Sequence, residues 1–316
     1  MNHASLAGHA TNHTTTSSSR VDAAHPFSSM IVSRLAPTPS GFLHQGNALN
    51  FILTWAVVRS LGGVLHLRID DLDALRTKDA YVEHIFRVLE WLGLDWDEGP
   101  TSVGEFEKKF ALPHRMEHYE RAKETLWAHP LTYACACSRK EILAQSPRGI
   151  YPFTCKEKHL LLKPFDTALR LHVDVSLCEE AHVVAKEMGD FVLWRKEGLP
   201  AYQLASLVDD TRMGVTLVVR GEDLRLSSLA QRYLAHVMGV SSFLDATIVH
   251  HPLLRDVSGA KLSKSQHACP VELTTSPCDL FRHASMFLGV QPCENSVDLL
   301  DALLQKEEYL LSPFSL

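Results

Sequence analysis

The sequence predicts an α/β protein with a doubly wound parallel sheet, and three features support this fold class. An extended run at residues 30–35 leads through a loop rich in proline and glycine to an apolar, helix-like run at 48–61. A second strand and an amphipathic helix follow at 64–69 and 79–92, and the alternation returns over 190–238. Strands that alternate with helices form parallel βαβ units, whose ligands bind at the carboxyl ends of the strands.

Composition places the chain among ordinary globular proteins. It has 316 residues, of which 46% are hydrophobic and 22% charged, enough for about two domains. A net charge of −6 means that any nucleic acid must bind a local positive patch. The sequence has seven cysteines and no apolar leader, which favours a reducing compartment, so we expect a cytoplasmic protein. We also expect a monomer. No apolar run approaches the roughly 18 residues of a membrane span, which excludes a membrane partner.

The alternation also predicts the domain organisation. The first 29 residues are rich in serine, threonine, histidine and alanine and predict a disordered tail. Because Met30 precedes the first strand, one hypothesis is that translation starts there. The pattern lapses in the middle of the chain, which indicates an insertion between two halves of one fold. The predicted parts are the first half of the sheet domain at 30–100, the insertion at 101–189, the second half at 190–256 with strands at 191–195 and 215–219 and helices at 199–208 and 228–238, and a lysine loop with two or three helices at 257–316.

The loop that precedes the 48–61 helix is a candidate phosphate site. Two prolines and Gly41 force a turn there, so the helix N-terminus directs backbone N–H groups and its positive dipole end at one place. His44 and Gly46 lie at that place: glycine allows close approach, and histidine can donate a hydrogen bond to a phosphate oxygen. On this loop alone, a plain βα connection is an equal alternative.

Three other clusters carry chemistry. Lys261 and Lys264 lie three apart in a glycine-led loop, a pattern also typical of a solvated surface loop. Cys135 and Cys137, with Cys155 further on, suit tetrahedral zinc, although buried free cysteines fit the spacing equally well. Aspartates at 70, 71 and 73 follow the second strand, where they could bind a metal, cap the next segment or hold an ammonium group.

The two loops together resemble the signature motifs of class I aminoacyl-tRNA synthetases, His-x-Gly-His and Lys-Met-Ser-Lys-Ser. The resemblance covers roughly residues 30–267 and implies a Rossmann-like nucleotide-binding fold. The segments that resemble the glutamyl branch of this class are 67–73, 190–194, 201–205, 208–210 and 219–224.

This resemblance implies roles for individual residues. His44, Gly46 and Lys264 would bind ATP and stabilise its phosphates, with Lys261 as a second catalytic candidate. Arg220 would hold the side-chain carboxylate of glutamate, since a guanidinium group matches a carboxylate in two hydrogen bonds. The implied glutamate-binding residues are Arg34, Leu35, Ala36, Pro37, Thr38, Asp70, Tyr202 and Arg220, with Asp70 at the place of a glutamate that binds the substrate's amino group.

The insertion indicates which group of these synthetases the sequence resembles most. Its Cys-x-Cys pair followed by Tyr-x-x-x-Cys is similar to the zinc site of the glutamyl-Q tRNA(Asp) synthetases, which makes Tyr151 the fourth ligand beside the three cysteines and His159 its replacement. Only 51 residues follow Ser265, too few for the anticodon-binding region of a full glutamyl-tRNA synthetase. The resemblance therefore implies activation of L-glutamate by ATP and Mg²⁺ without tRNA, and its transfer to the queuosine base in the anticodon of tRNA(Asp).

Three alternatives stay open. One is an ordinary glutamyl-tRNA synthetase that acylates the 3′ end of tRNA. Another is a non-catalytic paralogue that binds RNA or protein, an alternative supported by Gln45, Leu262 and Asp70, which all depart from the family pattern. The third, nucleotidyl transfer to a small molecule, is disfavoured by the glutamate-like pocket.

Overall fold

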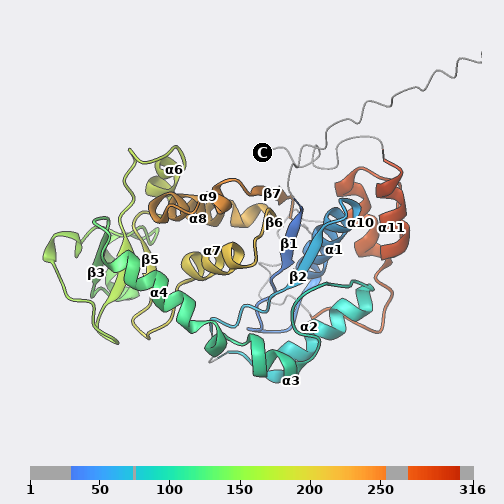
Figure 1. The fold of residues 1–316 in the computed structure, drawn as a ribbon, viewed down its shortest axis with the longest axis horizontal. Coiled ribbons are helices and arrows are strands. Elements are labelled where there is room, and N and C mark those ends of the chain that lie inside the picture. Colours follow the sequence, from blue (N-terminus) through green and yellow to red (C-terminus); the bar gives the residue numbers. More distant parts are fainter. Residues whose placement is uncertain (1–29, 74–75, 254–269, 307–316) are drawn as a thin grey trace, which may run out of the picture.

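Short parallel strands form the centre of the molecule in the computed structural model, which describes residues 30–73, 76–253 and 270–306 (Figure 1). Every strand in this part of the chain has four or five residues. The strands are β1 (Val32–Leu35), β2 (Val64–Leu67), β3 (Thr132–Cys135), β4 (Ala168–Leu171), β5 (Phe191–Trp194), β6 (Leu217–Gly221) and β7 (Thr247–His251).

The central strands form two parallel pairs, β1 with β2 and β6 with β7. The pairs meet at Val32, whose N–H donates to Thr216 Oγ1 and whose carbonyl accepts from the Thr216 N–H, both at 2.9 Å. The order across the molecule is therefore β2, β1, β6, β7. These parallel strands with helices between them confirm the predicted α/β class and fit a Rossmann-like fold.

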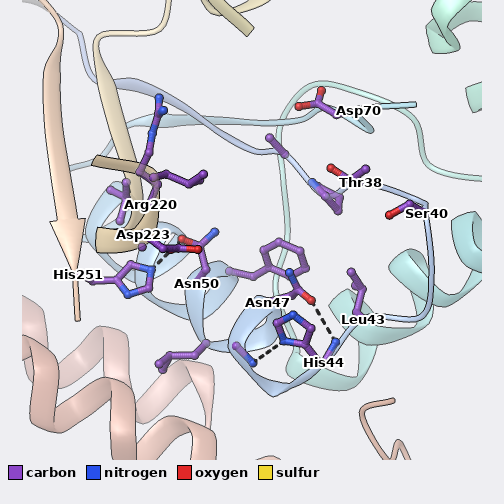
Figure 2. Close-up of a pocket in the computed structure, with 18 of the residues that line it drawn as sticks. Thr38, Ser40, Leu43, His44, Asn47, Asn50, Asp70, Arg220, Asp223 and His251 are labelled. Carbon is purple, nitrogen blue, oxygen red and sulfur yellow. Dashed lines mark hydrogen bonds between the residues drawn. The ribbon is translucent and has the colours of Figure 1, made fainter. Parts of the chain in front are cut away.

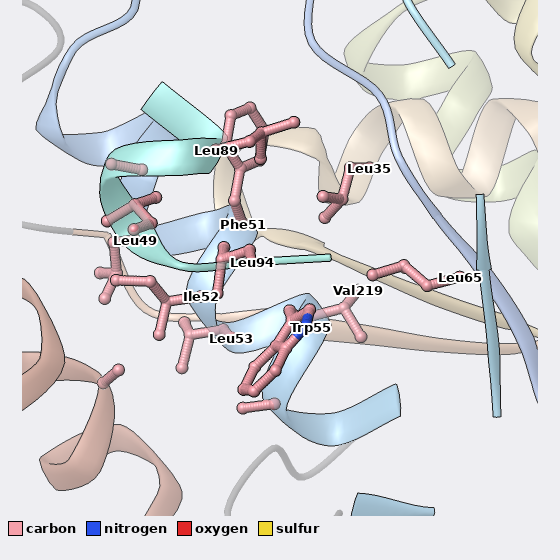
Figure 3. Close-up of a cluster of buried hydrophobic side chains, with 14 of the residues drawn as sticks. Leu35, Leu49, Phe51, Ile52, Leu53, Trp55, Leu65, Leu89, Leu94 and Val219 are labelled. Carbon is pink, nitrogen blue, oxygen red and sulfur yellow. The ribbon is translucent and has the colours of Figure 1, made fainter. Parts of the chain in front are cut away.

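Helix α1 is the core of this half of the molecule. It packs against β1, β2 and β6 on one side and against α2, α10 and α11 on the other (Figure 3). Ten of its sixteen residues are buried, which is typical of a helix enclosed on all sides rather than an amphipathic one. The helices are α1 (Gln45–Ser60), α2 (Asp79–Leu92), α3 (Val103–Glu105), η1 (Phe106–Phe110), η2 (Leu112–His114), α4 (Met116–Trp127), α5 (Arg139–Gln145), η3 (Lys156–Lys158), α6 (Glu180–Glu187), α7 (Tyr202–Arg212), η4 (Glu222–Leu224), α8 (Arg225–Met238), α9 (Ser241–Leu244), α10 (Cys278–Leu288) and α11 (Ser296–Leu304).

The middle of the chain forms a separate antiparallel sheet of β3, β4 and β5, at the opposite end of the molecule from α10 and α11 (Figure 1). The strand predicted at 191–195 was assigned to the parallel sheet, and this was wrong. As β5 it pairs antiparallel with β4, and the preceding Asp190 holds this pairing by accepting the Val173 N–H at 2.9 Å. A short apolar run does not specify its partner strand, which explains the error.

Two further predictions from the sequence concern the first helix and the helices after the lysine loop. The helix expected at 48–61 begins three residues earlier, at Gln45, because the preceding loop supplies its cap. Helices α10 and α11 follow the lysine loop and pack against α1. The tail at 1–29 and the loop at 257–269 lie outside the described residues. In the described part of the chain, no helix has both the length and the apolarity that a membrane crossing requires.

Candidate active site

A cavity of about 510 Å³ opens at the carboxyl ends of the parallel strands (Figure 2). Its wall comes from the β1–α1 loop, the residues after β2, the start of α7 and the turn after β6. Leu35, expected among the binding residues, is instead fully buried in the core, because successive side chains of a strand face opposite sides. The other predicted residues of the described chain that line this one cavity are Arg34, Ala36, Pro37, Thr38, His44, Gly46, Asp70, Tyr202 and Arg220.

His44 is the N-cap of α1, at the edge of the cavity. Its Nδ1 accepts the Gly46 N–H at 3.1 Å, and its own N–H donates to Asn47 Oδ1 at 3.0 Å, which together form a capping box (Figure 2). Because Nδ1 is an acceptor, the neutral ring carries its proton on Nε2, the tautomer that can donate to a phosphate. The Gly46 N–H, expected to face the phosphate itself, is held by this ring instead.

Gly46 also leaves room for the ring of the capping residue His44. A side chain there would place a Cβ atom 3.0 Å from Cε1 of His44, tighter than an ordinary contact. Glycine therefore leaves the imidazole in its capping position. The same absence of a side chain keeps the helix N-terminus open toward the cavity.

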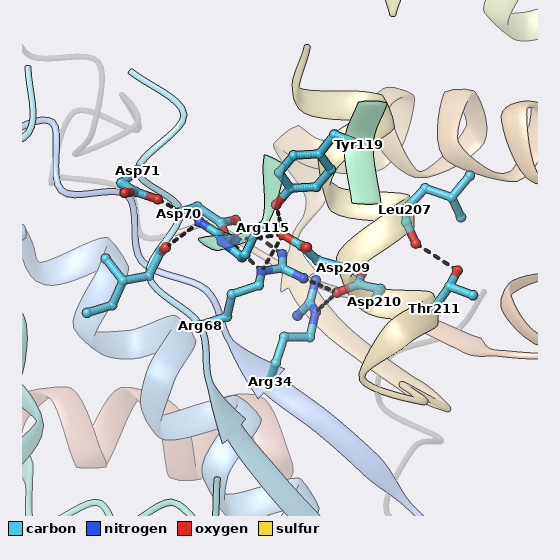
Figure 4. A network of polar contacts seen from close by, with 11 residues as sticks. Arg34, Arg68, Asp70, Asp71, Arg115, Tyr119, Leu207, Asp209, Asp210 and Thr211 are labelled. Atoms are coloured by element: carbon cyan, nitrogen blue, oxygen red, sulfur yellow. Dashed lines mark hydrogen bonds and ion pairs between the residues drawn. The ribbon is translucent and has the colours of Figure 1, made fainter. Parts of the chain in front are cut away.

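A network of buried ion pairs joins the cavity wall to α7 (Figure 4). Asp210 Oδ1 accepts from Arg34 Nε at 2.9 Å and from Arg68 Nη1 at 2.5 Å. Burial alone would raise the pKa of Asp210, but the Arg34 and Arg68 guanidinium groups hold it below its usual value. The carboxylate thus connects β1 and the end of β2 to a helix far away in sequence.

Arg115 continues this network on its other side. Its guanidinium group contacts Asp71 Oδ1 at 2.6 Å and Asp209 Oδ2 at 2.7 Å, and Tyr119 donates to the same Asp209 oxygen at 2.6 Å (Figure 4). Asp71 also accepts the Leu112 N–H at 2.8 Å. These contacts hold the start of the insertion against the parallel strands, and they give Asp71 a structural role.

Asp70 is buried and already paired. Arg68 binds it with two parallel hydrogen bonds, from Nε at 2.7 Å and from Nη2 at 3.1 Å. This bidentate arrangement orients the carboxylate at the cavity wall, where it lies close to Thr38 (Figure 2). A substrate ammonium group at Asp70 would therefore meet a carboxylate whose position is fixed before binding.

Arg220 differs from the other buried arginines of the cavity. Its side chain is buried, and its Nη1 donates to Gln231 Oε1 at 2.9 Å, but its Nε and Nη2 have no hydrogen-bond partner among the described residues. Burial, followed by repulsion from Arg34, lowers the pKa of Arg220 to about 10, so the group remains charged at neutral pH. Two unpaired donors on a buried cation form a site for an anion, and a carboxylate fits both donors at once.

Several residues of the site were missed in the sequence. Arg68 and Asp210 are buried charges, and the Arg115 side chain is 12% exposed; a charge removed from solvent is a signal that a partner exists elsewhere. The sequence cannot say which partner that is. His251 is a second example: it is buried at the end of β7 and contacts Asn50 of α1 at 2.9 Å on the cavity wall.

The predicted metal ligands lie together in the insertion. The sulfur atoms of Cys135, Cys137 and Cys155 are within 4.8 Å of one another, in a group that could hold a metal ion. The Tyr151 hydroxyl lies 3.2 Å from Cys135 Sγ and 3.7 Å from Cys137 Sγ, and it accepts the Cys155 N–H at 2.8 Å. His159 is not part of the group that meets this distance criterion among the described residues.

The thiol of Cys155 is suited to metal binding. Burial would raise its pKa, but hydrogen bonds from Tyr151, the Ala136 backbone and the two other thiols lower the pKa to about 7. The Arg170 guanidinium carbon lies 3.8 Å from the centre of the Tyr151 ring. That position fixes the ring. Burial and the hydrogen bonds with the three thiols raise the pKa of Tyr151, so the phenol is neutral until a metal ion takes its place among these partners.

Lys261 and Lys264 lie outside the described residues. The structure therefore shows nothing of their place relative to His44. Leu253, the last described residue before this loop, lines the same cavity.

The amino-acid sequence matches the family model of class I tRNA synthetases (E and Q), catalytic domain, over residues 30–151 and 167–277. A glutamyl-Q tRNA(Asp) synthetase of Nitratidesulfovibrio vulgaris is 36% identical over 265 residues, which are 77% of this chain and 80% of that protein. The protein of the same name in Pseudomonas fluorescens is 35% identical over 273 residues, covering 84% and 86%. That in Symbiobacterium thermophilum is 36% identical over 288 residues, covering 83% and 87%.

Solved structures share the fold. The glutamate-tRNA synthetase of Elizabethkingia anophelis superposes with a TM-score of 0.64 at 20% identity, over 89% of this chain and 66% of that one. A glutamate tRNA ligase of Elizabethkingia meningosepticum, in complex with its amino acid, gives 0.56 at 18% identity, over 89% and 65%. This chain thus spans just under two thirds of the length of these synthetases, and the likeness extends to the fold alone.

Proposed function

The chain belongs to the class I tRNA synthetases for glutamate and glutamine, and from this premise we propose that it activates glutamate with ATP, without tRNA, and transfers it to the queuosine base in the anticodon of tRNA(Asp). It is a ligase of the aminoacyl-tRNA synthetase type. The name shared by relatives that are about 35% identical over most of the chain supports the queuosine acceptor.

The observation that carries the proposal is the unpaired guanidinium group of Arg220 in the cavity wall. The side-chain carboxylate of glutamate would accept from its Nε and Nη2, the two donors that have no partner in the structure. The ammonium group would pair with the preoriented carboxylate of Asp70, and Tyr202 would close the pocket from the start of α7. Glutamine would leave part of this buried charge without its counter-ion, so the site selects glutamate.

The activation step needs position and charge rather than a general base. The α-carboxylate of glutamate is already ionised and attacks the α-phosphorus of ATP, and pyrophosphate leaves. Donation from His44 Nε2 would stabilise the phosphate oxygens at the N-terminus of α1, with Lys264 as the expected second donor. Mg²⁺ bound with ATP neutralises the phosphate charge.

The insertion would hold one zinc ion. Three thiols and a phenol oxygen at one point supply four ligand atoms, the number that a closed, structural zinc site needs, and thiolates are its commonest ligands. We assign Cys135, Cys137, Cys155 and Tyr151 as the four ligands, because Tyr151 lies within 3.7 Å of two of the sulfur atoms whereas His159 does not join the cluster. The site would stabilise the insertion and take no part in the chemistry.

Transfer to three forms of tRNA(Asp) tests the proposed acceptor. The first carries queuosine, the second carries unmodified guanosine in its place, and the third carries queuosine but lacks the terminal adenosine. We expect labelled glutamate to join the first and third equally and the second not at all. Transfer that requires the terminal adenosine and ignores queuosine would identify an ordinary glutamyl-tRNA synthetase instead.

A further inference from the structure

A second, smaller cavity adjoins the first one. Its volume is about 250 Å³, and it shares Thr38, Asp70 and Tyr202 with the larger cavity. Its remaining wall comes from the segment after β2 and from the β5–α7 connection. The residues that line only this cavity are Leu72, Asp73, Arg195, Pro200 and Ala201.

We propose that this second cavity holds the acceptor nucleoside and that the Asp73 carboxylate binds its cationic amine. The inference rests on the proposed function, in which the larger cavity contains glutamyl adenylate. The acceptor hydroxyl must reach the carbonyl carbon of that adenylate, and the shared wall at Asp70 and Tyr202 is where two such ligands meet.

Asp73 has the right charge and the right accessibility. Its side chain is 44% exposed, whereas Asp70 is buried and held by Arg68. Its recorded ion pair is with Arg76, at 3.5 Å, and the Arg76 side chain is 72% exposed. A surface pair of this kind contributes little stability, so Asp73 can exchange that partner for a ligand cation at small cost.

Arg195 supplies the hydrogen-bonding side of the cavity. Its Nη2 donates to the Leu72 carbonyl, which fixes the guanidinium group across the cavity wall. Its Nε is buried and has no hydrogen-bond partner in the part of the chain that the structure describes. A ligand with an acceptor atom, such as the carbonyl oxygen of a purine-like base, would satisfy this donor.

The chemistry of the cavity separates the two possible acceptors. Queuosine has a secondary amine, protonated at neutral pH, between its base and a ring that bears two hydroxyl groups. The terminal ribose of a tRNA has the hydroxyl groups but no cation. A carboxylate beside the transfer site therefore favours queuosine over a 3′ terminus.

The transfer step balances without an added reactant. A ring hydroxyl oxygen forms an ester bond with the glutamyl carbonyl carbon, and the bond from that carbon to the adenylate phosphate oxygen breaks. AMP leaves, and the hydroxyl proton passes to its phosphate or to water. Asp73 acts as a positioning residue, since it holds the amine and does not touch the reacting atoms.

The test replaces Asp73 by asparagine, which keeps its shape and removes its charge. We expect kcat/KM for transfer to queuosine-containing tRNA(Asp) to fall about tenfold or more, mainly through KM, while glutamate-dependent ATP–pyrophosphate exchange stays at the wild-type rate. Asp73→Glu should recover part of the transfer. The control is Glu83→Gln on α2, which removes an exposed charge elsewhere and should leave both rates unchanged.

Without a specific contact at Asp73, general electrostatics predicts that the loss of its charge would not lower the transfer rate. Loss of a negative charge strengthens binding of a polyanion, so without a specific contact Asp73→Asn would transfer as well as the wild type or better. That result, with wild-type exchange, would overturn the inference and leave the proposed function standing. A wild-type protein that exchanges pyrophosphate but does not need queuosine for transfer would overturn both.

Discussion

Arg220 shows most clearly how a single residue defines the site. A buried guanidinium group with two unpaired nitrogens is unfavourable in an empty cavity, and the pKa lowered to about 10 expresses the same cost. The cost is offset when an anion binds. The neighbouring Arg34 and Arg68 are already paired with Asp210. Arg220 therefore supplies the hydrogen-bond donors that remain for an incoming carboxylate.

Replacement of Arg220 by glutamine should therefore abolish the selectivity for glutamate. We expect kcat/KM for glutamate in ATP–pyrophosphate exchange to fall by about 10²-fold or more, because a charge-assisted bidentate contact is lost. Activity with glutamine should approach that with glutamate. The control is Arg225→Gln, an exposed arginine at the start of α8. Unchanged discrimination in Arg220→Gln would remove this residue from the pocket.

The residues of the cavity were predictable to different degrees. His44, Gly46 and Asp70 follow strands in the sequence, and parallel strands bring their carboxyl ends to one edge. Leu35 was included with its neighbours although the strand turns it into the core. Arg115 could not be assigned, because its partners Asp71 and Asp209 are 44 and 94 residues away and only the fold brings them together.

At the scale of elements, helix α7 and the insertion are fastened to the parallel strands by buried charge. Asp210 of α7 binds two arginines of the first half of the chain, and Asp209 binds Arg115 of the insertion. Such buried ion pairs contribute little more to the free energy of unfolding than apolar side chains of the same shape would. Removal of one partner, however, lowers the free energy of unfolding strongly, because the other charge stays buried without a counter-ion. The arrangement fixes the relative placement of elements that carry the cavity wall.

Asp210→Asn should consequently destabilise the protein by about 3 kcal/mol, because Arg34 and Arg68 lose a buried counter-ion. The pKa of Asp210 is lowered in the folded state, so its contribution is present above the unfolded value near 3.9 and is lost as the pH falls below it. Urea unfolding at pH 7 and at acid pH measures both effects. Asp279→Asn, which breaks an exposed pair with Arg282, should cost at most about 0.5 kcal/mol. Equal losses for the two variants would contradict this account.

The proposed zinc site would stabilise the insertion. The part of the insertion around the cysteines has a separate small core of Cys135, Ile142, Tyr151 and Cys155, too few side chains to fold that loop-rich part by burial alone. The family model leaves residues 152–166 unmatched, the segment that contains Cys155. Sequence spacing predicted that these residues lie together, whereas the strand pairing around them had to come from the structure.

Cys137→Ser should release zinc and loosen the insertion. We expect metal analysis of the purified variant to find less than about a tenth of an equivalent, against one in the wild type, because a structural site needs its full ligand set. The control is Cys278→Ser, which lies at the start of α10 outside the cluster. A full equivalent of zinc in Cys137→Ser would rule out this site.

At the scale of the whole molecule, the arrangement of the parallel strands and their neighbouring helices forms the two cavities. The strands and α1 build a cavity that combines a helix N-terminus with an unpaired buried arginine. The second cavity adjoins it beside the start of α7, where we propose that the acceptor binds. The sequence predicted the βα alternation of this plan, but the order β2, β1, β6, β7 rests on contacts such as Thr216 to Val32 that span more than 180 residues.

The most direct test of the central claim is ATP–pyrophosphate exchange by the purified protein with glutamate and no tRNA. We predict exchange with glutamate and none with glutamine or without an amino acid, since Arg220 and Asp70 line the cavity in their binding positions without any RNA. Lys264→Ala should abolish this exchange in a folded protein. Exchange that appears only when tRNA is added, or exchange that is absent under both conditions, would contradict the account.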